Sequence, residues 1–192
     1  MRSLKQCLFI LALMSFGCSK PMKLESYGDL GSFSLKNQHN QAFTQAQLQD
    51  KIWIADFIFT SCTTVCPRLT EQLRWVQAQL KDDSTPPMLL SFSVDPINDT
   101  PEKLTQYIKS HTINDQGWYF LTGELGAMKD LVVKGFKQAM GKDPAVPQEI
   151  FHGSHFILGR GKTMYGYFSS NKEGLSELVQ ATRALRKRPR SL

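Results

Sequence analysis

The sequence predicts an α/β fold in which a central mixed sheet is flanked by helices. Short apolar runs, which are typical of buried strands, alternate along the chain with amphipathic segments, which are typical of surface helices. Near the end of the chain, two apolar runs flank the turn sequence GRGK, which predicts a closing hairpin, and one more amphipathic segment follows. The length of 192 residues suffices for one domain with a substantial core.

The first half of the predicted fold is an N-terminal β-hairpin, then a buried strand, then a helix. Residues 32–44 place a polar turn between two short segments suited to strands. Residues 52–59 form a continuous apolar run bounded by polar residues, as expected of a strand covered on both faces. Residues 63–80 carry apolar side chains every three or four positions, which predicts a helix with one buried side.

The second half is predicted to begin with a strand at residues 85–95, which is entered through two prolines. Thr100 is a typical N-cap and Pro101 a typical first helical residue, so a helix is expected to run from there to about Ser110. The remaining expected elements are a strand at 118–121, an amphipathic helix at 124–137, a Pro-bearing loop at 141–150, strands at 155–158 and 164–168, and a helix at 175–186.

The first 30 residues are expected to export the chain and to tether it to a membrane. Arg2 and Lys5 precede an apolar stretch too short to span a bilayer as a helix, so residues 1–17 are predicted to be a signal peptide. Cys18 follows a small residue and resembles the lipidated cysteine of bacterial lipoproteins. Plain cleavage and an uncleaved anchor are the alternatives. Residues 18–30 then form a tether, and 31–188 form a domain on the periplasmic side of a bacterial cell envelope.

The formal net charge of +6 is concentrated at the two ends of the chain. The signal peptide carries two of the cations, and the segment 181–192 contains several more and no acidic residue. The body between these segments is therefore close to neutral, which argues against nucleic-acid binding. The basic tail is interpreted as a solvated end, and contact with anionic lipid headgroups is its functional alternative.

Cys62 and Cys66 are the residues that most clearly point to chemistry. They lie where the predicted strand passes into the predicted helix, and their i, i+4 spacing would place both sulfurs on one side of the first helical turn. The positive end of a helix stabilises thiolate over thiol. Two thiolates and a neutral imidazole, which the later sequence FHGSHF could supply, form a soft three-coordinate site that favours Cu(I) over hard cations.

Two other interpretations of the cysteine pair remain open. A structural disulfide is common in exported chains, although such a bridge rarely needs a strand-to-helix turn. Redox catalysis is the stronger rival, because a strand followed by closely spaced cysteines and a helix is typical of thioredoxin-like proteins. The usual redox spacing is CxxC, however, whereas this chain has CxxxC.

Three segments together are more specific than the CxxxC spacing alone. They are DFIFTSCTTVCPRLT with Cys62 and Cys66, SFSVDPINDTPEKLTQY with Asp95, and FHGSHFILGRGK with His152. In combination they resemble the Sco/SenC family of thioredoxin-like copper chaperones, over about residues 30–185. The resemblance implies a thioredoxin-like fold and delivery of copper to the dinuclear copper centre of cytochrome c oxidase. It also implies three partners: the copper-binding oxidase subunit, a thiol reductase and another copper carrier.

The resemblance also implies the metal ligands. Cu(I) would be held by Cys62, Cys66 and the imidazole of His152, with Cu(II) as a further oxidation state of the cargo. His155 then falls at a position where relatives carry another polar residue. Asp95 is expected either to cap a turn or to orient the metal loop from a position behind the ligands.

The remaining histidines and the methionines are also possible copper ligands by chemistry, but most are interpreted as surface or core residues. His39 and His111 fall in a predicted turn and at a helix end, so both are interpreted as surface residues. Most methionines sit in apolar patterns and are interpreted as core residues. Met140, close to the loop before His152, is the methionine kept as a possible soft ligand.

Two functions from different classes remain. The first is a metallochaperone, which binds and delivers copper and is not an enzyme. The second is a thiol-disulfide oxidoreductase that acts on the oxidase subunit or in redox defence, and it would not need His152. A reductase of this fold usually has a proline directly before the strand facing its cysteines, whereas this chain has Ser154 before HFIL. A third hypothesis is a copper sensor or buffer unrelated to respiration.

Overall fold

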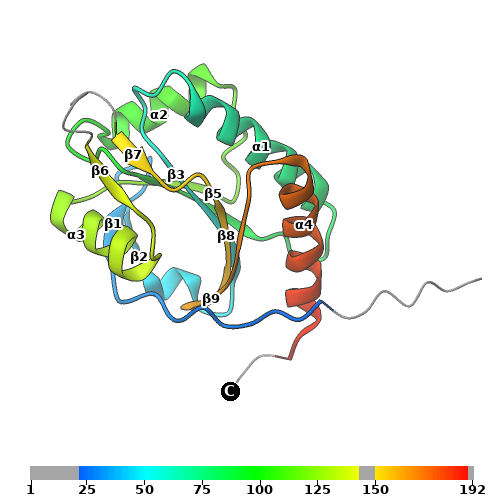
Figure 1. Cartoon of the computed structure of the whole chain (residues 1–192). Helices are drawn as coiled ribbons and strands as arrows, with labels where there is room; N and C mark the ends of the chain where they lie inside the picture. Colours follow the sequence, from blue (N-terminus) through cyan, green and yellow to red (C-terminus); the bar gives the residue numbers. More distant parts are fainter. Residues whose placement is uncertain (1–21, 143–149, 190–192) are drawn as a thin grey trace, which may run out of the picture.

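The computed structural model describes residues 22–142 and 150–189 and confirms the predicted mixed sheet. Its five strands lie in the order β5-β4-β3-β8-β9 (Figure 1). Strands β3, β4 and β5 are parallel, whereas β8 pairs antiparallel to β3 and β9 antiparallel to β8. The strand bounds are Ile52–Ile58 for β3, Met88–Ser93 for β4, Trp118–Leu121 for β5, Phe156–Arg160 for β8 and Thr163–Phe168 for β9.

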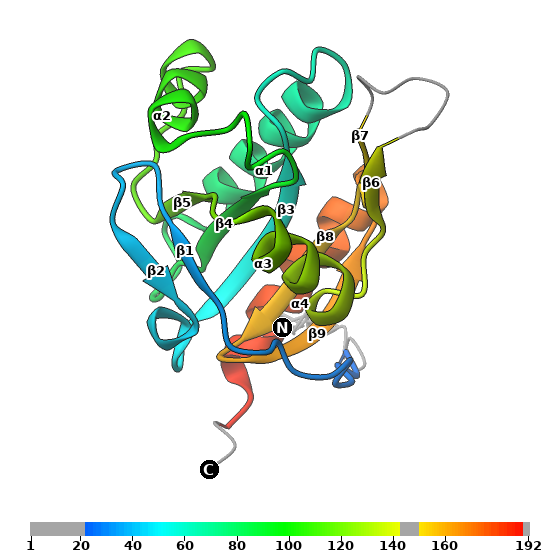
Figure 2. The same ribbon diagram turned by 90° about the vertical axis from the view of Figure 1, so that its left-hand side faces the viewer.

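Helices cover both faces of this sheet (Figures 1 and 2). Helices α1 (Val65–Leu80), α2 (Pro101–Ser110) and α4 (Lys172–Lys187) lie on one face. Helix α3 (Leu125–Asp130), which continues into a π-helical turn at Leu131–Gly135, lies on the other. This arrangement follows from the connections, because β3-α1-β4 and β4-α2-β5 are both right-handed crossovers and so place their helices on the same side.

The core between the sheet and the π-helical turn is aromatic. Phe136 lies 6.0 Å from Trp53, 5.3 Å from Phe57 and 4.9 Å from Phe92 between ring centroids, all edge-on. Such pairs each contribute about 0.5–1.5 kcal/mol beyond the burial of their surface. Phe136 therefore fixes the position of the segment that leads towards the histidine-bearing part of the chain.

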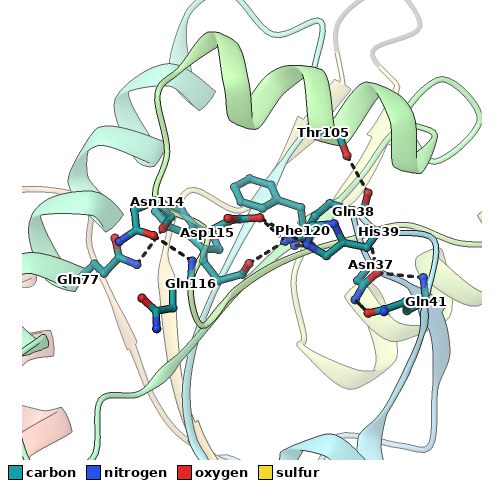
Figure 3. A network of polar contacts seen from close by, with 11 residues as sticks. Asn37, Gln38, His39, Gln41, Gln77, Thr105, Asn114, Asp115, Gln116 and Phe120 are labelled. Carbon is teal, nitrogen blue, oxygen red and sulfur yellow. Dashed lines mark hydrogen bonds and ion pairs between the residues drawn. The ribbon is translucent and has the colours of Figure 1, made fainter.

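The N-terminal hairpin is attached to the sheet by a polar network. Strands β1 (Ser34–Lys36) and β2 (Ala42–Thr44) form the hairpin, and the short helix η1 (Gln45–Leu48) follows. The buried side chain of Gln38 donates to Asp115 at 3.0 Å and accepts from the backbone N–H of Phe120 at 3.1 Å (Figure 3). The main-chain carbonyl of Gln38 accepts a hydrogen bond from the Thr105 hydroxyl at 2.7 Å. The hairpin turn is therefore held to both α2 and β5.

The described part of the predicted tether lies against the sheet. Tyr27 N–H donates to the carbonyl of Met164 at 2.9 Å, and Leu30 N–H donates to that of Lys162 at 2.7 Å. Residues 24–30 therefore follow the edge of β9. In residues 22–142 and 150–189 no helix is both long and apolar enough to cross a membrane.

The structure differs from the sequence prediction in two segments. Strands β6 (Met140–Lys142) and β7 (Ile150–His152) form a small antiparallel pair where only a loop was expected. The predicted helix at 124–137 divides into α3 and the π-helical turn. Its apolar pattern is compatible with both forms, because the wider turn still presents one side to the core.

We expect Gly159→Ala to destabilise the fold strongly, because a Cβ at this position would overlap the Trp53 ring. The indole cannot move freely, since its Nε1 donates to the carbonyl of Gly161 at 2.8 Å. Overpacking of this kind costs about 1–3 kcal/mol, which urea unfolding would measure. Gly31→Ala is the control, because a Cβ there meets nothing within 4 Å. Equal stability of the two variants would contradict the proposed contact.

Candidate metal and redox site

The two cysteines lie at the carboxyl edge of the parallel strands. Strand β3 ends at Ile58 and α1 begins at Val65, and the loop between them carries Cys62. Cys66 lies in the first turn of α1. In open α/β sheets this edge is where ligands bind, because the loops after neighbouring parallel strands converge there. The antiparallel strand β8 begins at the same edge, so its preceding residues arrive beside the cysteine loop.

The geometry of the pair differs from the sequence prediction in one respect. Both sulfurs were expected on the first helical turn, but Cys62 precedes the helix. Its Sγ accepts a hydrogen bond from the backbone N–H of Cys66 at 3.3 Å. Thr64, in the N-cap position, makes no side-chain cap. The Cys62 sulfur thus occupies the place that a capping oxygen usually takes, where the partial positive charge of the helix end is strongest.

The two thiols have opposite acidities. Partial burial acts to raise the pKa of Cys62, but the Cys66 thiol and the backbone N–H groups of Cys66, Thr64 and Val65 outweigh it and hold that pKa below its usual value. Burial strongly raises the pKa of Cys66, and its hydrogen bond to Cys62 and the charges of Cys62 and Asp56 raise it further. Cys66 is fully buried, whereas Cys62 is partly exposed, and no disulfide joins them. The pair therefore combines one accessible thiol of increased acidity with one buried thiol that holds its proton more tightly.

Asp99 fixes the start of the cysteine loop. This fully buried carboxylate accepts from the Thr60 hydroxyl at 2.5 Å and from the Thr60 backbone N–H at 3.2 Å. Ser93 at the end of β4 donates to its other oxygen at 2.6 Å. Burial raises the pKa of Asp99, although these donors oppose the shift. The Asp99 carboxylate therefore joins the end of β4 to the segment that follows β3. It binds that segment at Thr60, two residues before Cys62.

Asp95 caps the turn that presents Asp99. Its carbonyl accepts from the backbone N–H groups of Asn98 at 3.0 Å and Asp99 at 2.9 Å. Its carboxylate accepts from the Asn98 side chain at 2.8 Å. These contacts fit the turn-cap interpretation of Asp95. A role in orienting the metal loop stays a prediction, and such a role would act through Asp99 and Thr60.

Asp56 is a charged residue in the middle of the central strand. It is 1% exposed, and its Oδ1 accepts from Ser91 at 2.6 Å. Its Oδ2 has no hydrogen-bond partner within the described residues. Burial raises the pKa of Asp56 to about 7, and the Ser91 hydrogen bond opposes the shift only in part. Near neutral pH this carboxyl is therefore balanced between its acid and its anion, and its charge acts on Cys66.

The predicted histidine ligand lies on β7. His152 is opposite Met140 in the β6–β7 register, but the His152 side chain lies outside the described side chains. His155 is exposed directly before β8. His39 is exposed, as predicted, whereas His111 is half-buried, with its ring tilted against Tyr107 at the end of α2. Within the described residues no group of three or more His, Cys, Asp or Glu could hold a metal ion, so the third ligand stays a prediction.

Comparison with known proteins identifies the family. Residues 24–187 match the family model described as SCO1/SenC. The chain belongs to the Sco/SenC family. The SCO1 protein homolog of Bacillus subtilis is 33% identical over 137 residues, which cover 70% of this chain and 71% of that protein.

Solved Sco/SenC structures share the fold. A SCO1/SenC family lipoprotein from Bacillus anthracis aligns with a TM-score of 0.76 and 29% identity, over 88% of this chain and 98% of that one. BsSco aligns with a TM-score of 0.75 and 27% identity, over 89% of this chain and all of that one. Arabidopsis thaliana ScoI, solved with copper bound, aligns with a TM-score of 0.72 and 21% identity over 84% of this chain and 100% of that one, which shows the fold alone.

Two carboxylates of this Sco/SenC chain were missed by the sequence analysis as functional residues. Asp56 was read as part of an apolar run, although an acid inside a strand buried on both faces is itself a signal of a special environment. Asp99 was recognised only as part of a sequence signature. Its contact with Thr60 joins residues 39 positions apart, and no local pattern predicts such a contact.

We expect the stability of the reduced, metal-free protein to fall as the pH rises from about 4 to 7. The folded state holds the Asp56 proton up to about pH 7, whereas the unfolded chain releases it near the ordinary aspartate pKa of 3.8. The unfolded chain thus binds fewer protons in this window, and the loss is at most about 4 kcal/mol.

Asp56→Asn should remove most of this slope, since the amide does not titrate. Urea unfolding at pH 5 and pH 8 would measure it. The matched control is Asp82→Asn, because Asp82 is 90% exposed and should keep the wild-type slope. An unchanged slope in Asp56→Asn would show that this carboxyl titrates normally.

Proposed function

We propose that the protein is a copper chaperone of the bacterial cell envelope that carries Cu(I) on Cys62, Cys66 and His152. Its acceptor would be the dinuclear copper centre of cytochrome c oxidase. The observation that carries the proposal is the pairing of an accessible, acidic thiol with a buried thiol at the sheet edge where the β7–β8 segment arrives. In a Sco/SenC chain, this pair is the natural place for a soft cation.

The two thiols suggest an order for copper loading. Cys62 is partly exposed and its pKa is held below the usual value, so it would meet the incoming Cu(I) first. Cys66 binds as a thiolate only after it loses its proton, and the positive charge of the metal compensates for the negative charge that burial disfavours. The helix end and the hydrogen bond from Cys66 N–H hold the first sulfur in place during this step.

Relatives support the partners that we propose. The protein BsSco is described as a member of the Sco family of cytochrome c oxidase assembly proteins with a disulfide switch. A Stutzerimonas stutzeri protein, 27% identical over 128 residues, is described as copper-binding. For this chain we infer the oxidase copper-binding subunit as acceptor, another copper carrier as donor, and a thiol reductase that keeps Cys62 and Cys66 reduced.

The same two thiols also favour a second candidate function, thiol–disulfide exchange. The Cys62 thiolate would attack a sulfur of a partner disulfide, form a mixed disulfide and release one partner thiolate. Cys66 would then lose its proton and attack the Cys62 sulfur, which releases the second partner thiolate. Two electrons pass to the partner, and Cys62 and Cys66 become an intramolecular disulfide. The asymmetry of the two thiols is what this sequence of steps requires.

We infer that Cys18 carries the membrane anchor, with the domain on the periplasmic side. A lipoprotein of the same family from Bacillus anthracis supports this inference. Residues 24–30 are fixed along β9, so the link between Cys18 and the folded body is short.

The first test separates the two histidines. His152→Ala should weaken Cu(I) binding by about tenfold or more, because even the loss of a residue that only supports a metal ligand commonly has this effect. Competition of the reduced protein against a Cu(I) chelator would measure the affinity, and X-ray absorption should show one nitrogen neighbour lost. His155→Ala is the matched control and should bind normally. Loss of binding in the control alone would place the ligand at His155.

The second test separates the two functions. If the protein delivers copper, His152→Ala should impair assembly of the oxidase copper centre in cells while disulfide exchange in vitro stays nearly unchanged. The rate of disulfide exchange in vitro and the amount of assembled oxidase in cells would be measured for the wild type, His152→Ala and Cys62→Ser. Normal assembly in His152→Ala together with failure in Cys62→Ser would favour the oxidoreductase instead. Copper retained by the doubly substituted Cys62→Ser and Cys66→Ser protein would overturn the metal site itself.

A further inference from the structure

The domain has two chemically different ends. The cysteine loop lies at one end, where α1 begins (Figure 2). The other end is formed by the end of α4 and the β8–β9 turn (Figure 2). Helix α4 has 16 residues, so its axis alone separates its two ends by about 24 Å. A surface that contacts the second end therefore leaves the cysteine loop accessible.

The described chain enters the domain at this second end. Arg188 donates from Nη1 to the carbonyl of Leu24 at 2.8 Å, and its guanidinium lies 5.6 Å from the centre of the Tyr165 ring. Arg160 in turn donates to the carbonyls of Arg188, at 3.1 Å, and of Leu185. The entry of the chain and the end of α4 thus form one connected structure (Figure 1).

Cations gather around this entry. Gly161 N–H donates to the carbonyl of Lys51, which brings the loop before β3 to the β8–β9 turn. The cations of this end are Lys51, Arg160, Lys162, Arg183, Arg186, Lys187 and Arg188. The carboxylates nearby are fewer: Glu25 pairs with Lys23, Asp29 pairs with Lys162, Asp83 pairs with Arg183 and Arg186, Asp50 precedes Lys51, and the exposed Asp82 lies between Lys81 and Asp83.

We propose that this basic end rests on the anionic headgroups of the membrane that carries the anchor, and so directs the cysteine loop away from that membrane. The proposal rests on the anchor at Cys18 but not on copper binding. Leu24 is six residues after Cys18, so the entry can lie at most about 20 Å from the anchor. Within about 10 Å of an anionic surface, each Lys or Arg contributes about fivefold to binding.

The orientation would serve the proposed delivery. A tethered domain without a preferred face would present its cysteine loop to the bilayer for part of the time. With the basic end on the headgroups, α4 would act as a spacer and the loop would face partners in the periplasm. Anionic lipid is favoured over nucleic acid as the occupant, because the chain is tethered at this same end and its remaining surface is close to neutral.

The test uses the chain without residues 1–18, which keeps every residue of the described core, since that core begins at Leu24. Its partition onto vesicles of phosphatidylcholine with one third phosphatidylglycerol would be measured by sedimentation, at low and high salt. Binding should require the anionic lipid and be lost at high salt. The double variant Lys51→Gln and Lys187→Gln should bind about 25-fold more weakly, which is about fivefold for each charge.

The matched control removes the same charge from the other end. Lys103 and Lys172 are exposed in the first turns of α2 and α4, and Lys103→Gln with Lys172→Gln should leave the partition nearly unchanged. Spin-labelled headgroups should broaden the amide signals of residues 51, 162 and 187 and spare those of residues 60–66. Equal loss in the two double variants, no binding to the anionic vesicles, or tighter binding to a DNA duplex would overturn the proposal. Cu(I) titration of the same variants tests the proposed function separately.

Discussion

The pairing of β3 on both of its edges is the constraint on which the site depends. Parallel pairing with β4 brings the ends of β3 and β4 to one edge, where Asp99 joins Thr60 to Ser93. Antiparallel pairing with β8, in a register that sets Ile54 against Leu158, makes the next strand begin at that same edge. A shift of one residue in either register would move every side chain of the shifted strand to the opposite face of the sheet. Strand pairing therefore places the cysteine loop and the start of β8 at the same edge of the sheet.

Most of the scaffold was predictable because it rests on local patterns. The apolar run at residues 118–121 became β5, and Thr100 with Pro101 began α2 as expected. The β6–β7 pair was not predictable, because its strands have three residues each and flank a segment that contains two prolines. Short strands of this kind are held by tertiary contacts, here beside a segment fixed by Phe136.

The candidate site was predictable in composition but less so in geometry. The cysteine spacing identified both sulfurs, yet an i, i+4 spacing does not say where a helix starts. Helix α1 begins at Val65, so Cys62 lies before the helix. Its sulfur accepts a hydrogen bond at the N-terminal end of α1 and replaces the missing side-chain cap. The assignment of His152 as the third ligand comes from the resemblance of FHGSHFILGRGK to the histidine segment of the family. The raised pKa of Asp56 could be recognised only in the structure, because it results from the complete burial of the carboxyl.

Asp56 and Cys66 together show why a buried dithiol site would select a cation. A low-dielectric region disfavours each anion separately, and the pKa of both groups is raised by burial. Two anions near one another are disfavoured further, so loss of the Cys66 proton makes an anionic Asp56 less favourable. Covalent capture in a disulfide or binding of Cu(I) removes this conflict, because neither outcome leaves an uncompensated thiolate. The buried carboxyl is therefore expected to lower stability above pH 4, and its charge adds a small contribution to the burial that holds the proton on Cys66.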